Sequence, residues 1–178
     1  MSYIERDIDK DLEDWAISKS RKPLLLRGAR QVGKSSSVRK LGEKFEHYLE
    51  INFEKEKNVR ELFETADSLH PPTLCSKLSL IKDMPVVPGK TLLFFDEIQR
   101  CLPAISSLRF FYEDYPALHV VAAGSLLEFA LEELPSLENK KLGGRVFHYS
   151  LFTIYSVISL FSSSIANPTH SASGYAFA

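Results

Sequence analysis

One stretch of the sequence combines glycine, lysine and serine at a spacing that suits the binding of a triphosphate. Residues 28–35, GARQVGKS, read G-x-x-x-x-G-K-[ST], which is the pattern of phosphate-binding loops. Its two glycines let the backbone curl, so that successive N–H groups point into one concavity at the positive end of the following helix. Lys34 would reach the β- and γ-phosphates, and the Ser35 hydroxyl would ligate Mg²⁺.

The residues on either side supply the local structure that such a loop needs. Residues 23–26 form a short apolar run typical of a buried strand, and Val38, Leu41 and Phe45 follow at helical spacing. The sequence therefore predicts strand, loop and helix, against the alternative of a glycine-rich turn with a surface lysine. The residues expected around the phosphates are Gly28, Ala29, Arg30, Gln31, Val32, Gly33, Lys34, Ser35 and Ser36.

Two carboxylates follow a second apolar run. Residues 91–97 read TLLFFDE, and the four consecutive apolar residues indicate a buried parallel strand with Asp96 and Glu97 at its carboxyl end. Asp96 would hold Mg²⁺, through a water or through Ser35, and Glu97 would polarise the attacking water as a general base. The alternative is that both acids only cap the next helix.

Two further strands end in polar side chains. Residues 47–53 alternate in polarity and predict a strand with Asn52 at its carboxyl end, where open α/β sheets place ligands. Residues 117–123 predict another buried strand, which Ser125 follows. The Ser125 hydroxyl would bond the γ-phosphate or the water, or it would cap a helix over residues 126–134, and both interpretations stay open.

Helical patterns separate these strands. The predicted helices span residues 2–18, 60–69, 73–82 and 103–114. Pro71 and Pro72 are expected to stop the second helix, and Thr73 is expected to cap the third. Residues 84–90 carry two prolines and a glycine and are expected to form a loop, while residues 146–151 predict a last strand.

Composition limits the class of protein. The chain of 178 residues is 44% hydrophobic and 25% charged, as expected for a soluble globular domain. Its net charge of −1 argues against a nucleic-acid binder, although basic residues crowd residues 19–44. Cys75 and Cys101 form no disulfide or metal framework, and no histidine cluster has metal-ligand spacing. We find no signal peptide or membrane span and expect a cytoplasmic protein.

The composition changes after Arg145, which is the last charged side chain if histidines are set aside. Residues 152–178 are uncharged and rich in serine, so we expect a poorly ordered tail or a truncated end. The predicted organisation is an N-terminal helix over residues 1–18, a core over residues 19–151 and this tail.

The motifs together resemble one family. The strings LLLRGARQVGKSS, LEINFE, LLFFDEIQRC, HVVAAGSLLEFAL and GGRV occur in the order found in prokaryotic AAA-type ATPases, in which an AAA domain (AAA_14) precedes a DUF4143 domain. The resemblance covers residues 6–151, and we expect this chain to lack the second domain. It implies an α/β P-loop NTPase fold of the ASCE or RecA-like type. That fold is a three-layer sandwich around a parallel sheet of order 5-1-4-3-2.

The resemblance also implies roles by position. Residues 28–35 resemble Walker A, and residues 96–97 resemble Walker B. Ser125 falls where the sensor-1 residue lies, and Asn52 falls where related ATPases place a polar partner for the catalytic glutamate. Arg145 resembles the family's Gly-Arg element, either as an arginine finger toward a γ-phosphate or as part of a structural ion pair.

These patterns predict an ATP hydrolase that uses Mg²⁺. The alternative is a nucleotide-dependent switch or scaffold that binds ATP or ADP with negligible turnover. The presence of Glu97 favours hydrolysis, whereas the truncation that we expect at the C-terminal end favours the switch. DNA binding through the basic N-terminal third is a weaker interpretation, and a homo-oligomer or a protein partner stays open.

Overall fold

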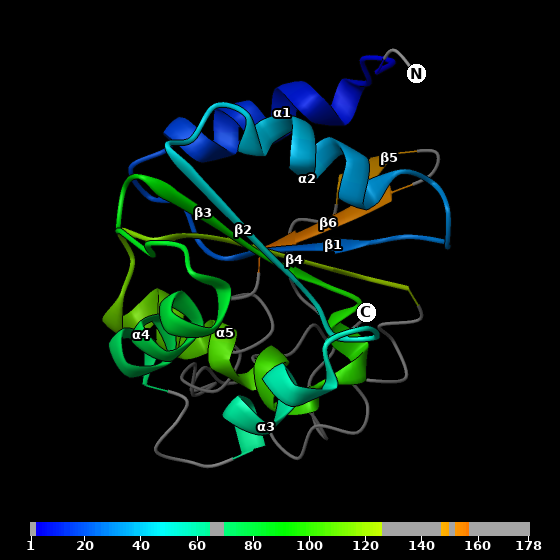
Figure 1. Cartoon of the computed structure of the whole chain (residues 1–178). Coiled ribbons are helices and arrows are strands. Elements are labelled where there is room, and N and C mark those ends of the chain that lie inside the picture. The colour runs from blue at the N-terminus through cyan, green and yellow to red at the C-terminus, as the bar shows by residue number, and fades with distance from the viewer. Residues whose placement is uncertain (1–2, 65–69, 126–146, 150–151, 157–178) are drawn as a thin grey trace, which may run out of the picture.

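The computed structural model describes residues 3–64, 70–125, 147–149 and 152–156. In this part of the chain one sheet lies between two layers of helices, with α1 and α2 on one face and α3, α4 and α5 on the other (Figure 1). The helices are α1 (Asp7–Ile17), α2 (Lys34–Gly42), α3 (Lys57–Glu64), α4 (Pro71–Lys82), the short 3-10 helix η2 (Ile98–Arg100) and α5 (Leu102–Asp114). The strands are β1 (Leu24–Arg27), β2 (His47–Asn52), β3 (Thr91–Asp96), β4 (His119–Gly124), β5 (Phe147–Tyr149) and β6 (Phe152–Ser156).

The sheet has the strand order β2-β3-β4-β1-β6-β5. Strands β2, β3, β4 and β1 run parallel to one another, which confirms the α/β class and the predicted order 1-4-3-2. Parallel neighbours require crossover connections, and the helices that make them cover both faces of the sheet. The carboxyl ends of all four strands therefore meet at one edge.

The place of the predicted fifth strand in the sheet is wrong. Strand β5 lies inside the predicted range 146–151, but the neighbour of β1 is β6, which runs antiparallel to it. Strand β5 pairs with β6 at the far edge, also antiparallel. Only residues 150–151 separate the two strands, and so short a connection can join antiparallel neighbours but cannot cross over to a parallel one. The sheet thus extends past residue 151, into the range expected to be tail.

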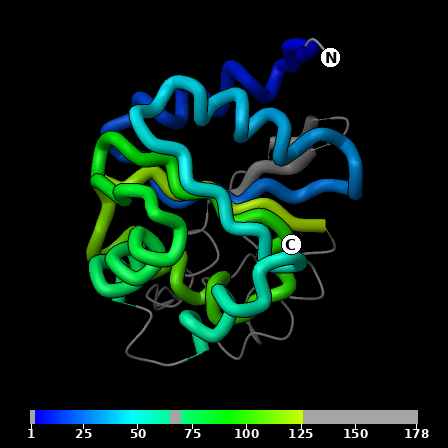
Figure 2. Tube along the Cα trace, viewed as in Figure 1, coloured from blue at the N-terminus to red at the C-terminus, as the bar shows by residue number. Residues whose placement is uncertain are grey.

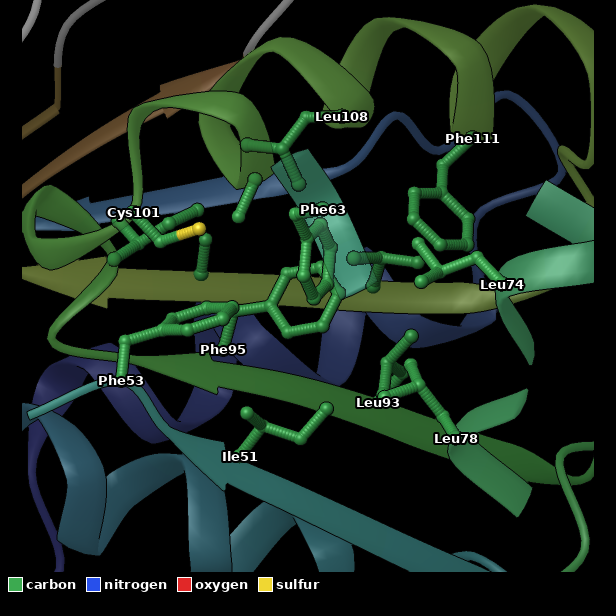
Figure 3. Packing of buried hydrophobic residues seen from close by; sticks show 14 of the residues in the cluster. Ile51, Phe53, Phe63, Leu74, Leu78, Leu93, Phe95, Cys101, Leu108 and Phe111 are labelled. Carbon is green, nitrogen blue, oxygen red and sulfur yellow. The ribbon is translucent and has the colours of Figure 1, made fainter. Parts of the chain in front are cut away.

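The face under α3, α4 and α5 holds an aromatic core (Figure 3). The Phe95 ring lies 5.6 Å from Phe53, 5.6 Å from Phe63 and 6.1 Å from Phe111, measured between ring centroids. These rings come from β3, from the residue after β2, from α3 and from α5. Each is 1% exposed or less, so the aromatic core joins the sheet to two of the three helices on this face.

The opposite face packs on α1 and α2. Ile8 and Leu12 of α1 meet Val38 and Leu41 of α2 over the alternate side chains of the strands, such as Phe94. Figure 2 shows the N-terminal segment running beside α2 along this face. The helix predicted over residues 2–18 is therefore confirmed in the range Asp7–Ile17, and it brings the N-terminal segment close to the start of α2.

Two predicted helix boundaries are wrong. Pro71 and Pro72 occupy the first turn of α4, where proline is tolerated because the first N–H groups have no partner within the helix. The residue before the helix is His70, so Thr73 is not the cap. Helix α3 begins at Lys57, earlier than predicted, and the predicted continuation over 65–69 lies outside the described residues, as does the predicted helix 126–134.

Candidate nucleotide-binding site

The phosphate-loop sequence connects β1 to α2, as predicted. Two of its residues have left-handed backbone conformations, Gln31 with φ of 62° and Gly33 with φ of 91°. Gly33 is the residue that directly precedes α2. Left-handed turns of this kind aim successive N–H groups into a common concavity, and the start of the helix adds its positive dipole end. The loop therefore has the backbone features of an anion site.

Lys34 lies inside this loop and is 8% exposed. Its ammonium donates to the carbonyl oxygens of Gly28 and Ala29, each at 2.7 Å. Burial lowers the pKa of Lys34, and the negative charges of Glu97 and Asp96 oppose that shift. The cation is thus placed between the loop and the two acidic residues.

The loop meets the sheet edge through Asp96, the last residue of β3. Ser35 Oγ donates to both Asp96 carboxylate oxygens, at 3.0 and 3.1 Å. Asn52 Nδ2 donates to Asp96 Oδ2 at 3.2 Å, because Asn52 and Asp96 are paired in the register of β2 and β3. The Glu97 backbone N–H also donates to Asp96 Oδ1, at 3.1 Å. These contacts hold the carboxylate in one orientation.

The residues around Asp96 fit a magnesium ion. Asp96 is 6% exposed, and burial raises the pKa of its carboxyl group, while the Ser35 hydrogen bond opposes that rise. A carboxylate beside a hydroxyl is the hard oxygen donor set that Mg²⁺ prefers. The described residues contain no cluster of three or more acidic, histidine or cysteine side chains that could hold a metal. An ion held here would therefore complete its shell with phosphate oxygens and water.

Glu97 has a strained backbone and a tethered side chain. Its φ of 53° and ψ of 43° lie in the left-handed region, which costs a non-glycine residue on the order of 1 kcal/mol. Gln99 Nε2 donates to Glu97 Oε2 at 2.6 Å and lies 3.4 Å from Ser125 Oγ. The other amide atom, Gln99 Oε1, is buried and has no partner among the described residues. Gln99 therefore connects the acid after β3 with the hydroxyl after β4.

The structure brings together most of the predicted site residues. Lys34, Ser35, Asn52, Asp96, Glu97 and Ser125 all lie at the carboxyl ends of β1 to β4. Asn52, however, bonds Asp96, and the position beside the Glu97 carboxylate belongs to Gln99. Arg30 lies 3.9 Å from Glu54, and Ser36 is exposed on α2. Arg145 lies outside the described residues.

Two residues at this site were not predicted from the sequence. Gln99 follows Glu97 by two positions, but the left-handed turn at Glu97 decides where its amide lies, and no periodic pattern reveals such a turn. Arg6 reaches the loop from the N-terminal segment, where Nη1 donates to the Gly33 carbonyl at 3.0 Å. Arg6 and Gly33 are 27 residues apart in the sequence, so no local sequence pattern indicates this contact.

A cavity of about 490 Å³ lies elsewhere, near the amino ends of β3 and β4. Ala16, Ile17, Phe45 and His119 contribute to its lining. His119 is engaged structurally, since Nε2 lies 3.0 Å from the Ala16 carbonyl and its ring packs edge-on against Phe45. Because phosphate loops bind through backbone N–H groups in an open cradle, the motif outweighs cavity size in locating the site.

The parallel core and the phosphate loop between β1 and α2 define an α/β protein of the P-loop class. A family model described as an AAA domain (AAA_14) matches residues 20–156, and the chain belongs to this family. The AAA domain is a nucleotide-binding P-loop ATPase domain. No curated protein and no solved structure matched the chain. Within the described ranges, no helix combines the length and the apolar character needed to cross a bilayer.

Proposed function

We propose that this AAA domain binds ATP together with Mg²⁺ and hydrolyses it. The observation that supports this most directly is the contact between Ser35 and Asp96, which joins two motifs 61 residues apart. Each motif alone has a structural explanation, since a glycine-rich turn and a helix-capping acid are both common. The hydroxyl and the carboxylate in contact, with Lys34 beside them, match the requirements of a bound triphosphate and its cation.

Binding begins with the release of Lys34 from the loop. Its ammonium would exchange the carbonyls of Gly28 and Ala29 for β- and γ-phosphate oxygens, which are charged and therefore stronger acceptors. The N–H groups of the loop would hold the remaining phosphate oxygens. Ser35 and Asp96 would hold Mg²⁺, which neutralises developing charge on the phosphates when bound.

Hydrolysis would use Glu97 as the general base. The oxygen of a water forms a bond to the γ-phosphorus, the bond from that phosphorus to the β–γ bridging oxygen breaks, and ADP leaves with the electron pair. The water proton passes to the Glu97 carboxylate. Lys34 would stabilise the charge that grows on the transferred group. Adenine is the base we expect, because the sequence has no Asn/Thr-Lys-x-Asp string of the kind that recognises guanine.

A second function is a nucleotide-dependent switch with negligible turnover. The tether from Gln99 to Glu97 favours it, because a carboxylate held at 2.6 Å by an amide has to be freed or shared before it accepts a proton. ATP would then shift a conformational population without being consumed. The two functions share the binding site and differ only in the use of Glu97.

The first experiment is Mg²⁺-dependent phosphate release from ATP by the purified chain, with ATP affinity measured in parallel. Lys34→Ala removes the loop cation, and Lys40→Ala is the matched control, because Lys40 is an exposed lysine on the same helix. Turnover that Lys34→Ala abolishes and Lys40→Ala retains supports the hydrolase. Glu97→Gln should then still bind ATP while turnover falls at least ~100-fold.

Three outcomes separate the alternatives. Tight ATP binding without turnover favours the switch. Normal hydrolysis by Glu97→Gln contradicts the assignment of Glu97 as the general base, but it leaves the assignment of the nucleotide-binding site unchanged. If the chain binds neither ATP nor ADP, both functions are rejected.

A further inference from the structure

Arg6 is the residue that directly precedes α1, and its side chain crosses to the phosphate loop. Nη1 donates to the Gly33 carbonyl at 3.0 Å and lies 3.5 Å from the Val32 carbonyl, at the outer limit of a hydrogen bond. The loop therefore receives a cation on its outer side, through carbonyl groups of the peptides around Gly33.

The geometry of the peptide unit gives this contact a consequence. In a trans peptide the C=O and the N–H point in opposite directions. The Val32 carbonyl shares its peptide with the Gly33 N–H, and the Gly33 carbonyl shares its peptide with the Lys34 N–H. The Gly33 carbonyl also accepts the Ser37 N–H at 3.1 Å, in the first turn of α2. The guanidinium therefore helps to hold the two carbonyls on one side and their N–H groups on the other, and it also polarises these N–H groups as donors.

We propose that Arg6 is a positioning residue of the nucleotide site, which binds no phosphate itself but sets the direction and strength of the loop N–H donors that do. The inference rests on the proposed function, because the phosphates of the nucleotide are the ligand in question.

Arg6 is itself held in place by the N-terminal segment. Its backbone N–H donates to Asp9 Oδ2 at 2.8 Å, and its guanidinium lies over the Tyr3 ring, 5.8 Å from the centroid. The Tyr3 hydroxyl donates to Asp9 Oδ1 at 2.6 Å and lies 3.1 Å from Ser37 Oγ on α2. The buried residue Ile8 fastens the start of α1 to the same face. A side chain fixed in this way loses little additional entropy when the loop binds a ligand.

Gly33 is what admits the guanidinium. A Cβ built on Gly33 would collide with Arg6 Nη1, so a side chain at this position and the arginine compete for the same space. The left-handed φ of 91° already favours glycine here. Two features of this chain thus require glycine at position 33, the left-handed backbone conformation and the close approach of Arg6.

The test compares the affinity of the chain for Mg²⁺-ATP and for Mg²⁺-tripolyphosphate, which lacks the nucleoside. Arg6→Ala should weaken both about tenfold or more, because charge-assisted hydrogen bonds to the loop are lost. Arg6→Lys keeps the charge without the fork of donors and should give a smaller loss. Arg109→Ala is the matched control, because it removes an exposed arginine hydrogen-bonded to Glu113 on α5, and it should change neither affinity.

A purely structural role for Arg6 predicts a different pattern. It would lower the melting temperature of the free chain and leave the affinity of the folded fraction unchanged. Adding ethylguanidinium to Arg6→Ala should restore part of the lost tripolyphosphate affinity if a missing guanidinium is the cause. If Arg6→Ala fails to fold, Arg6→Lys decides in the same assay, and a folded lysine variant with undiminished affinity for both ligands overturns the proposal.

The failure of this proposal can be told apart from failure of the proposed function. If the unaltered chain binds ATP and Lys34→Ala does not, the nucleotide site stands, and equal affinities for Arg6→Ala and the unaltered chain then reject only the role of Arg6. If the unaltered chain binds neither ATP nor tripolyphosphate, the proposed function and the proposed role of Arg6 are both rejected.

Discussion

The aromatic core and the polar edge of the sheet, which consists of Ser35, Asn52 and Asp96, meet on strand β3, where an aromatic residue is followed directly by a carboxylate. Phe95 is fully buried and packs against Phe53 and Phe63. The next residue, Asp96, is also buried but makes its contacts with the side chains of Ser35 and Asn52. Buried side chains therefore serve two purposes, one apolar and one polar, within a single strand.

The two regions differ in what burial does to the free energy of folding. Removing an aromatic ring from water stabilises the fold whether or not the protein functions. Removing a carboxylate from water is unfavourable, which is why burial raises the pKa of Asp96. We infer that the aromatic core supplies the stability that allows the polar edge to keep charged groups ready for a ligand.

The largest expected effect belongs to the aromatic core. Phe95→Ala should lower the free energy of unfolding by about 3–5 kcal/mol, because it removes a ring that contacts three others and leaves a cavity behind it. Urea unfolding followed by circular dichroism measures the change. Leu80→Ala is the control, since Leu80 is 83% exposed on α4 and should change stability by less than ~0.5 kcal/mol.

A loss below about 1 kcal/mol for Phe95→Ala would contradict the role given to the aromatic core. It would mean that α3 and α5 can close over the space that the ring leaves.

The next effect has the opposite sign and tests the polar edge. Asp96→Asn should raise the free energy of unfolding by about 0.5–2 kcal/mol at neutral pH, because it removes a buried charge. Its one carbonyl oxygen still accepts the hydrogen bonds from Ser35 and from the Glu97 N–H, and only the bond from Asn52 is lost. The same variant should lose the Mg²⁺ dependence of ATP binding. Chemical unfolding and nucleotide titration with and without Mg²⁺ measure the two changes.

The pH dependence of this gain follows from the direction of the Asp96 pKa shift. A raised pKa in the folded state means that folding favours the protonated acid, so the contribution of Asp96 to stability is present below its ordinary pKa of 3.8 and is lost as the pH rises through the folded value. The difference between Asp96→Asn and the unaltered chain should therefore be largest near neutral pH and shrink as the pH falls toward 3.8. A difference that grows on acidification would reject this account of the polar edge.

The regions of the molecule also differ in how far the sequence predicts them. The buried strands β3 and β4 and the phosphate loop follow from apolar runs and from one specific motif, and the structure has them where they were predicted. Once the four strands are parallel, their carboxyl ends must share an edge, so the approach of Ser35 to Asp96 follows from the topology.

What the sequence did not predict depends on single backbone conformations and on distant contacts. The left-handed turn at Glu97 places Gln99 beside the acid, and the packing of α1 on α2 brings Arg6 to Gly33. Strand β6 was missed because a stretch without charges and rich in hydroxyl groups resembles a tail, although pairing with β1 makes it a strand.

The smallest expected effect on stability is at Gln99, where the two regions meet. Gln99→Leu removes the hydrogen bond to Glu97 and the longer contact to Ser125. It also removes a buried carbonyl oxygen that has no partner among the described residues, so these contributions should cancel to within about 0.5 kcal/mol. The effect on Glu97 should be visible in turnover instead. If the amide restrains the base, ATP turnover rises several-fold in Gln99→Leu, and if the amide orients the base, turnover falls, with ATP affinity unchanged in both cases. Thermal unfolding and steady-state phosphate release on the same sample separate these outcomes, and a large loss of stability would show that Gln99 belongs with the aromatic core and not with the polar edge.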